Sequence, residues 1–122
     1  MKAKRLKTLR ILAGVRQSWR CHYCWFPMWE GDLNPFIARY GISKREAMRF
    51  QCTAEHVRAR CDGGEDSAAN IVAACRACNG LRHRRKKPLS ADDHAVHVGK
   101  RLAEGRWLPA HLRAVFAKER RC

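Results

Sequence analysis

Residues 54–85 read AEHVRARCDGGEDSAANIVAACRACNGLRHRR, and this stretch decides the fold of the 122-residue chain. The residue types predict a short strand over 52–60, a glycine-bearing loop over 61–70 and a second strand over 71–75. The basic segment that follows predicts a helix that ends before Pro88. The pattern therefore indicates a small α+β protein centred on residues 52–87.

Four of the seven cysteines form two C-x-x-C pairs. Cys21 and Cys24 stand in RCHYC, and Cys75 and Cys78 stand in ACRAC. Two such pairs supply the four thiolates that tetrahedral zinc accepts. Because four protein ligands leave no open position, we expect this Zn²⁺ to be structural.

The remaining cysteines leave alternatives open. Seven is an odd number, and four of the seven lie in C-x-x-C pairs; in a reducing compartment this pattern indicates metal binding more often than disulfides. The pairs could instead be redox-active or merely buried thiols, or Cys52 or Cys61 could replace a member of the set. Cys122, like those two, is expected to be an ordinary small residue.

The order of residues in the central segment resembles the HNH endonuclease family. That family has an acidic residue and a histidine at the end of one strand, an asparagine before the next, and a histidine or asparagine on the following helix. Here these positions are Glu55 with His56, then Asn70, then Asn79, at spacings of fourteen and nine residues. C-x-x-C pairs flank the motif in zinc-containing members of the family. The resemblance implies a ββα-metal (His-Me finger) fold, in which a two-stranded hairpin is followed by a helix.

The resemblance also implies a role for each matching residue. His56 would be the general base that activates water, and a histidine suits proton transfer near neutral pH. Glu55 and Asn79 would hold one catalytic cation, Mg²⁺ or Mn²⁺, through hard oxygen ligands. His83, one helical turn beyond Asn79, would join them. Asn70 would cross-link the hairpin and aim His56.

Two features stand against a simple transfer of these roles. Strict alternation along a strand would send Glu55 and His56 to opposite faces, so the strand must twist or end there. Taken singly, each residue of the motif is more often a surface or turn residue. Only the ordered set beside the cysteine pairs favours a nuclease.

The charge of the chain points to a polyanionic partner. Lysines and arginines number 26 against 11 acidic residues, and the formal net charge is +15. Part of the basic run over 82–87 is expected to contact the backbone of duplex DNA without reading its sequence. The candidate DNA-binding residues are Arg58, Arg60, Arg82, Arg84, Arg85 and Lys86.

The flanking segments are expected to complete a single domain over 1–122. Residues 1–20 predict a basic helix with an apolar stripe that includes Leu12, Val15 and Trp19. Residues 21–51 hold the first cysteine pair and an insertion, in which Ser43 and Glu46 form a capping box. A helix-turn-helix over 36–50 is the less favoured interpretation of this insertion.

The C-terminal extension, residues 88–122, predicts two further helices. Ser90 with Asp93 would cap the first, Gly105 would end it, and Pro109 would start the second. His94 and His97 lie a helical turn apart, and we expect both to be solvated.

The sequence therefore predicts a metal-dependent DNA endonuclease of low or short-motif specificity. The alternative is a non-catalytic, zinc-stabilised nucleic-acid-binding or packaging accessory module. No small-molecule cofactor is expected. The longest uninterrupted apolar runs are far too short for a membrane span, and Arg10 interrupts any signal-peptide-like stretch. We expect a cytoplasmic location.

Overall fold

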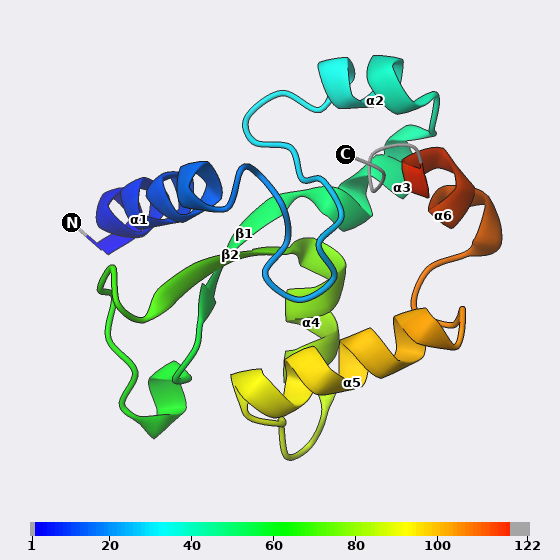
Figure 1. Ribbon diagram of the computed structural model, residues 1–122. Coiled ribbons are helices and arrows are strands. Elements are labelled where there is room, and N and C mark those ends of the chain that lie inside the picture. Colours follow the sequence, from blue (N-terminus) through cyan, green and yellow to red (C-terminus); the bar gives the residue numbers. More distant parts are fainter. Residues whose placement is uncertain (1, 118–122) are drawn as a thin grey trace.

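A computed structural model describes residues 2–117 (Figure 1). Over these residues the structure is α+β, with one antiparallel hairpin and six α-helices. The strands are β1 (Cys52–His56) and β2 (Ile71–Cys75), and the helices are α1 (Lys2–Arg16), α2 (Asn34–Tyr40), α3 (Lys44–Ala47), α4 (Arg76–Arg84), α5 (Ala91–Ala103) and α6 (Ala110–Ala117). The predicted fold class, a hairpin followed by a helix with helical extensions, is confirmed.

The hairpin pairs the two strands over their full length. Cys52 lies opposite Cys75, and His56 lies opposite Ile71. The connecting loop folds back tightly, because a Cβ atom at Gly64 would lie 1.7 Å from the carbonyl oxygen of Arg58. Only glycine fits at this close approach of two backbone segments.

Helix α1 packs across both strands of the hairpin (Figure 1). Its buried residues are Ala13 and Gly14, whereas Leu12 and Val15 are 50% and 59% exposed. The expected apolar stripe is therefore wrong at these two positions. The helix ends before Trp19, whose backbone has a φ of 58°. Its ring folds back onto Gly14, where a Cβ atom would lie 2.4 Å from the indole.

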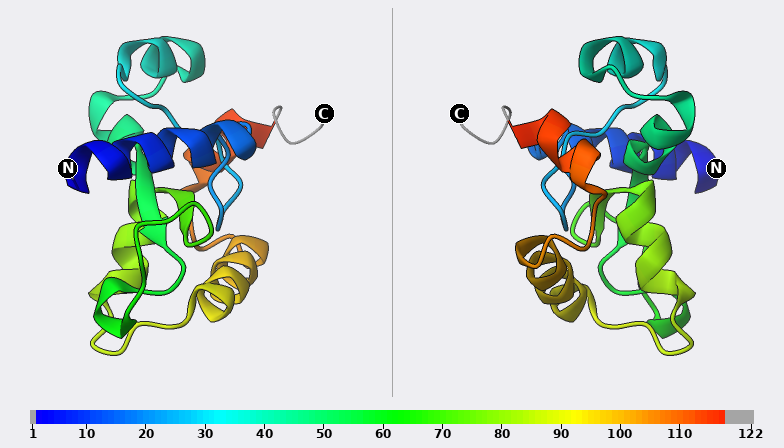
Figure 2. Two further views of the ribbon diagram at one scale, coloured as in Figure 1. Left: turned by 90° about the vertical axis from the view of Figure 1, so that its left-hand side faces the viewer. Right: turned by 90° about the vertical axis from the view of Figure 1, so that its right-hand side faces the viewer.

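A cluster of aromatic rings joins the insertion to the C-terminal helix. The ring of Phe116 on α6 lies 4.8 Å from Tyr40, 4.9 Å from Phe50 and 5.4 Å from Phe26, measured between centroids. Such pairs add to the stabilisation that comes from buried area. Both views of Figure 2 show α4 and α5 below α1.

The predicted helix caps of the extensions are present. Ser43 and Glu46 form the capping box of α3, and the side chain of Ser90 accepts a hydrogen bond from the backbone N–H of Asp93 at the start of α5. Gly105 follows α5 with a φ of 72°. The four residues of α3 are too few for the recognition helix of a helix-turn-helix.

None of the helices in the described residues has the length and apolar character needed to cross a bilayer.

Candidate metal centre and active site

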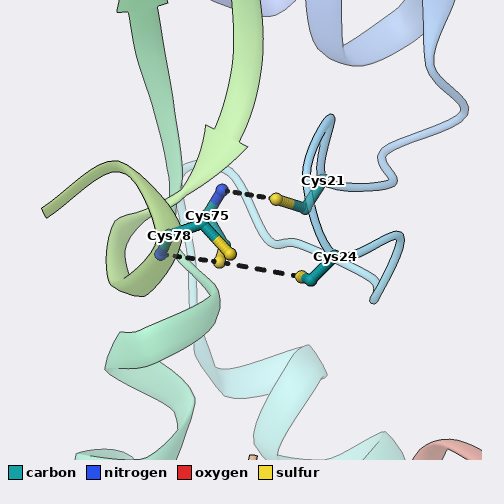
Figure 3. Close-up of side chains that lie close together, drawn as sticks. All are labelled: Cys21, Cys24, Cys75 and Cys78. Carbon is teal, nitrogen blue, oxygen red and sulfur yellow. Dashed lines mark hydrogen bonds between the residues drawn. The ribbon is translucent and has the colours of Figure 1, made fainter. Parts of the chain in front are cut away.

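The four predicted cysteines come together in one buried cluster (Figure 3). Their sulfur atoms all lie within 4.8 Å of one another, and Cys24 Sγ lies 3.9 Å from Cys75 Sγ. Tetrahedral zinc with bonds of about 2.3 Å would place its sulfur ligands about 3.8 Å apart. The cluster could therefore hold a metal such as zinc.

Two segments that are far apart in the sequence build this cluster. Cys21 and Cys24 lie in the turn after α1, Cys75 ends β2, and Cys78 lies in the first turn of α4. Backbone N–H groups donate to the sulfurs, from Cys75 to Cys21 Sγ at 3.3 Å and from Cys78 to Cys75 Sγ at 3.4 Å. The indole N–H of Trp107 donates to Cys78 Sγ at 3.2 Å. Such donors stabilise sulfur in its thiolate form.

The shifted pKa values of the clustered cysteines also favour binding of a cation. Burial raises the pKa of Cys21, but hydrogen bonds with the other three cysteines outweigh it and hold this pKa well below its usual range. Hydrogen bonds with the neighbouring thiols raise the pKa of Cys24 well above its usual range. One thiol thus ionises at the expense of its neighbours, and a cation is what allows four adjacent sulfurs to be thiolates together.

The remaining cysteines do not join this group. Cys52 is buried on β1, and burial first of all raises its pKa to about 12. Cys61 is exposed, and Cys122 lies outside the described residues.

A second site opens where β1 ends beside α4. A pocket of about 410 Å³ is lined by Leu6, Ala54, Glu55, His56, Ala59, Arg60, Cys61, Asn79 and His83. Glu55 and His56 both line it, although they are neighbours on β1. Because β1 ends at His56 and the chain bends immediately afterwards, strand alternation does not separate the two side chains.

Glu55 is the most constrained member of the pocket. Its side chain is buried. Oε2 accepts a hydrogen bond from Tyr23 Oη at 3.0 Å and forms an ion pair with Arg82 Nη1 at 3.2 Å. Oε1 lies 3.0 Å from His83 Nε2 on α4. One carboxylate oxygen is therefore bound to the protein interior, and the other faces the pocket.

The donor atoms in this pocket fit a cation. Two neighbouring ligands of an octahedral cation, at about 2.1 Å from it, lie about 3 Å apart. Glu55 Oε1 and His83 Nε2 have this separation, at 3.0 Å. They could bind a cation from adjacent positions.

Asn79 presents its amide oxygen. Its Nδ2 donates to Thr53 Oγ1 at 3.0 Å and to the carbonyl of Ala54 at 3.2 Å. The carbonyl of Ala54 can only accept, so the amide nitrogen must face β1. The oxygen of Asn79 then accepts no hydrogen bond from the described residues.

Asn70 ties the loop between the strands. Its side-chain oxygen accepts from the backbone N–H of Arg58 at 2.8 Å, and its Nδ2 donates to the carbonyls of Arg58 at 3.0 Å and Glu65 at 2.9 Å. Its backbone carbonyl accepts from Val57 at 2.9 Å. These contacts fix the segment that follows His56.

His56 contacts a residue that the sequence motif does not include. Its Nε2 lies 2.7 Å from Asp66 Oδ1, and Arg60 lies beside both. Asp66 was not predicted, because no periodicity or motif marks it in the sequence. The turn of the loop brings it to the end of β1.

The predicted role of Arg82 in DNA binding is wrong. The residue is 3% exposed, and its guanidinium donates to the carbonyls of His56 at 3.0 Å, Val57 at 3.2 Å and Leu89 at 3.0 Å. Since it also pairs with Glu55, each of its three nitrogens is bound within the protein. Arg82 is a structural residue beneath the pocket.

The other candidate DNA-binding residues are on the surface. Arg58 and Arg60 lie in the loop, and Arg84 closes α4; all three are exposed. Arg85 and Lys86 follow the helix and are exposed too.

His94 also differs from expectation. It is 1% exposed, and its Nε2 hydrogen-bonds to the carbonyl of Cys78 at 3.0 Å. Burial lowers its pKa, so the ring is held neutral. The expectation of solvation is wrong here because α5 packs this face onto the start of α4.

Comparison with known proteins agrees with this geometry. Searches of curated proteins and of solved structures returned no match. Residues 43–85 match the family described as HNH endonuclease. These residues include β1, the loop, β2 and α4, and therefore Glu55, His56, Asn70 and Asn79. Residues 43–85 thus match an HNH endonuclease domain, and the four-cysteine cluster fits the zinc-containing type of that family.

Proposed function

We propose that this protein is a metal-dependent DNA endonuclease that hydrolyses phosphodiester bonds. It would nick or cut duplex DNA with low or short-motif specificity. The observation that carries the proposal is the convergence of Glu55, His56, Asn79 and His83 on one open pocket, beside exposed arginines. Pure binding needs no such combination of a base and cation ligands.

His56 is the proposed general base. Its side chain is 14% exposed and lines the pocket, so the imidazole is held in place but reaches solvent. It takes a proton from a water molecule that attacks the phosphorus atom, and the bond to the 3′ oxygen breaks. Base catalysis of this kind contributes about 10² to 10⁴ in rate.

Glu55, Asn79 and His83 are the proposed ligands of Mg²⁺ or Mn²⁺. The cation, when bound, stabilises negative charge on the phosphate and on the leaving oxygen. Glu55 supplies the one carboxylate, which is buried and paired with Arg82. The four cysteines bind one structural Zn²⁺, which holds the start of α4 and hence Asn79 in position.

The substrate is held by its backbone. Arg58, Arg60 and Arg84 are exposed near the pocket or at the end of α4, where they can contact phosphates on either side of the scissile bond. Arg85 and Lys86 extend this basic surface. No residue is assigned to reading bases.

Conversion of supercoiled plasmid to nicked or linear forms tests the proposal. Wild-type protein should cleave with Mg²⁺ or Mn²⁺ and not with chelator. His56→Ala should lower the rate about 10²-fold or more while plasmid binding persists. His111→Ala is the matched control, because this exposed histidine on α6 lies outside the pocket.

Two outcomes would contradict the proposal. Plasmid binding without cleavage in every cation would favour the non-catalytic nucleic-acid-binding module. Equal loss of cleavage, zinc and DNA binding in His56→Ala would show that this histidine is structural.

A further inference from the structure

We propose that Asp66 is a positioning residue for His56, which it holds through Nε2 so that Nδ1 takes the proton from water. This inference rests on the proposed function and adds a residue outside the matched HNH positions. It assigns a further role to the loop between the two strands.

The geometry assigns Nε2 of His56 to the contact with Asp66 and leaves Nδ1 for proton transfer. His56 Nε2 lies 2.7 Å from Asp66 Oδ1, and the two side chains are 14% and 18% exposed. Among the described residues, no hydrogen bond reaches Nδ1. Since His56 lines the pocket with the cation-ligand candidates, Nδ1 is the nitrogen left to accept a proton there.

The charge state of Asp66 sets the tautomer of the His56 imidazole. The hydrogen bond from His56 is the main cause that holds the pKa of Asp66 below its usual range, and the charge of Arg60 acts in the same direction. An ionised carboxylate can only accept, so His56 Nε2 must carry the hydrogen. Neutral His56 then has a bare Nδ1, which is the form a base requires.

Arg60 supports the carboxylate rather than the imidazole. Its Nε lies 3.3 Å from His56 Nε2, but it cannot donate to a nitrogen that already carries hydrogen. Its Nη2 lies 3.3 Å from both oxygens of Asp66. We therefore assign Arg60 to the carboxylate, where its side chain remains 58% exposed.

Contacts from other segments hold Asp66 in place. Arg5 on α1 donates from Nε to the carbonyl of Asp66 at 3.1 Å, and Asn70 donates to the carbonyl of the preceding Glu65 at 2.9 Å. The carboxylate therefore faces His56 before any substrate binds. When His56 takes a proton, the new imidazolium charge lies beside this carboxylate and is stabilised by it, as in a histidine-acid pair of a hydrolase.

Substitutions at two neighbouring acids test the assignment. Asp66→Ala should lower kcat for plasmid cleavage about tenfold or more and change KM far less, because every basic residue of the DNA-binding surface is retained. Asp66→Asn keeps an acceptor without the charge, so its loss should be smaller. Glu65→Ala is the matched control: Glu65 is exposed, and its side chain makes no hydrogen bond within the described residues.

Two further measurements separate positioning from a structural role. In a His56→Ala background, Asp66→Ala should cause no additional loss, because Asp66 acts only through the imidazole. By NMR, wild-type protein should show a ring N–H proton on His56 Nε2 that is protected from exchange. This signal should be lost in Asp66→Ala and retained in Glu65→Ala.

The outcomes are distinguishable from failure of the proposed function. Absence of cleavage by the wild type overturns the proposed function, whereas the NMR signal still reports the His56–Asp66 pair. A protected signal that survives in Asp66→Ala overturns the positioning role alone. So does an additional loss of activity in the double variant, or an equal loss in Glu65→Ala.

Discussion

The four-cysteine cluster and the HNH pocket are built from the same hairpin and helix, yet they are opposite kinds of site. The four cysteines are 0–2% exposed and point their sulfurs at one another, with no charged side chain among them. In the pocket, the single carboxylate is already paired with Arg82, and His83 is 37% exposed. From this comparison we expect a permanent metal in the first site and propose an exchangeable cation in the second.

The largest effect on folding is expected from a substitution that breaks the cysteine cluster. Cys75→Ser removes one of four ligands, and structural zinc in small domains contributes on the order of 10 kcal/mol to folding. We expect insoluble or unfolded protein without zinc, measured by metal content and circular dichroism. Cys61→Ser, an exposed cysteine outside the cluster, should keep one zinc per chain. Folded, zinc-free Cys75→Ser protein would refute the assignment.

The next prediction compares a buried arginine beneath the pocket with an exposed arginine on the same helix. Arg82→Met leaves the buried carboxylate of Glu55 without its partner, and breaking such a pair costs about 3–5 kcal/mol. Urea denaturation should show this loss in the free energy of unfolding. Arg84→Met, two residues along the same helix but exposed, should change stability by about 0.5 kcal/mol or less. Equal stability of the two variants would argue against a structural role for Arg82.

A third experiment compares the cation requirements of the two sites. Because Arg82 neutralises Glu55, we expect weak cation binding, with cleavage that needs Mg²⁺ or Mn²⁺ in the millimolar range and stops in a chelator too mild to remove zinc. Asn79→Ala should raise the cation concentration for half-maximal cleavage and leave zinc content unchanged. Asn79→His should shift preference towards Mn²⁺, Co²⁺ or Ni²⁺, which imidazole suits better.

Cleavage rates across these metals decide the point. If Asn79→Ala cuts at the wild-type rate at every Mg²⁺ concentration, Asn79 is not a ligand. The pair formed by Glu55 and His83 would then be the cation site.

The smallest effect concerns the surface beside the pocket. Neutralising Arg84 and Arg85 together should weaken duplex binding for unrelated sequences. The slope of log affinity against log salt should become shallower by about 0.9 for each DNA phosphate that the protein no longer neutralises. Lys44 and Arg45, an exposed basic pair on α3, provide the matched double variant and should leave the slope unchanged. An effect confined to one sequence would indicate base reading.

Local pattern was sufficient for the second strand, the helix caps and the cysteine set, whereas the first strand, predicted over 52–60, ends at His56. The residues predicted for the second strand, 71–75, are those of β2, and the capping residues Ser43 and Ser90 begin the helices they were expected to begin. These features depend on near neighbours in the chain, because caps, turns and strand propensity act within a few residues. The two C-x-x-C pairs were recognisable because metal chemistry restricts both residue type and spacing.

Side-chain partners across the fold were not predictable in this way. Arg82 belongs to a run of basic residues that looks uniformly solvated, and His94 lies on an ordinary amphipathic helix. Each became buried because packing turned its face inward, against the end of β1 for Arg82 and against the start of α4 for His94.

The sequence by itself determined the strand-loop-strand-helix order and the two C-x-x-C pairs, because each is a short-range pattern of residue types, and its resemblance to the HNH family marked the candidate site residues. Only the tertiary structure decided that Asp66 meets His56, that Arg82 neutralises Glu55 and that Trp19 folds onto α1. The physical reason is that a side chain's partner depends on which surfaces come together when separate elements pack. Spacing along the chain does not encode that directly.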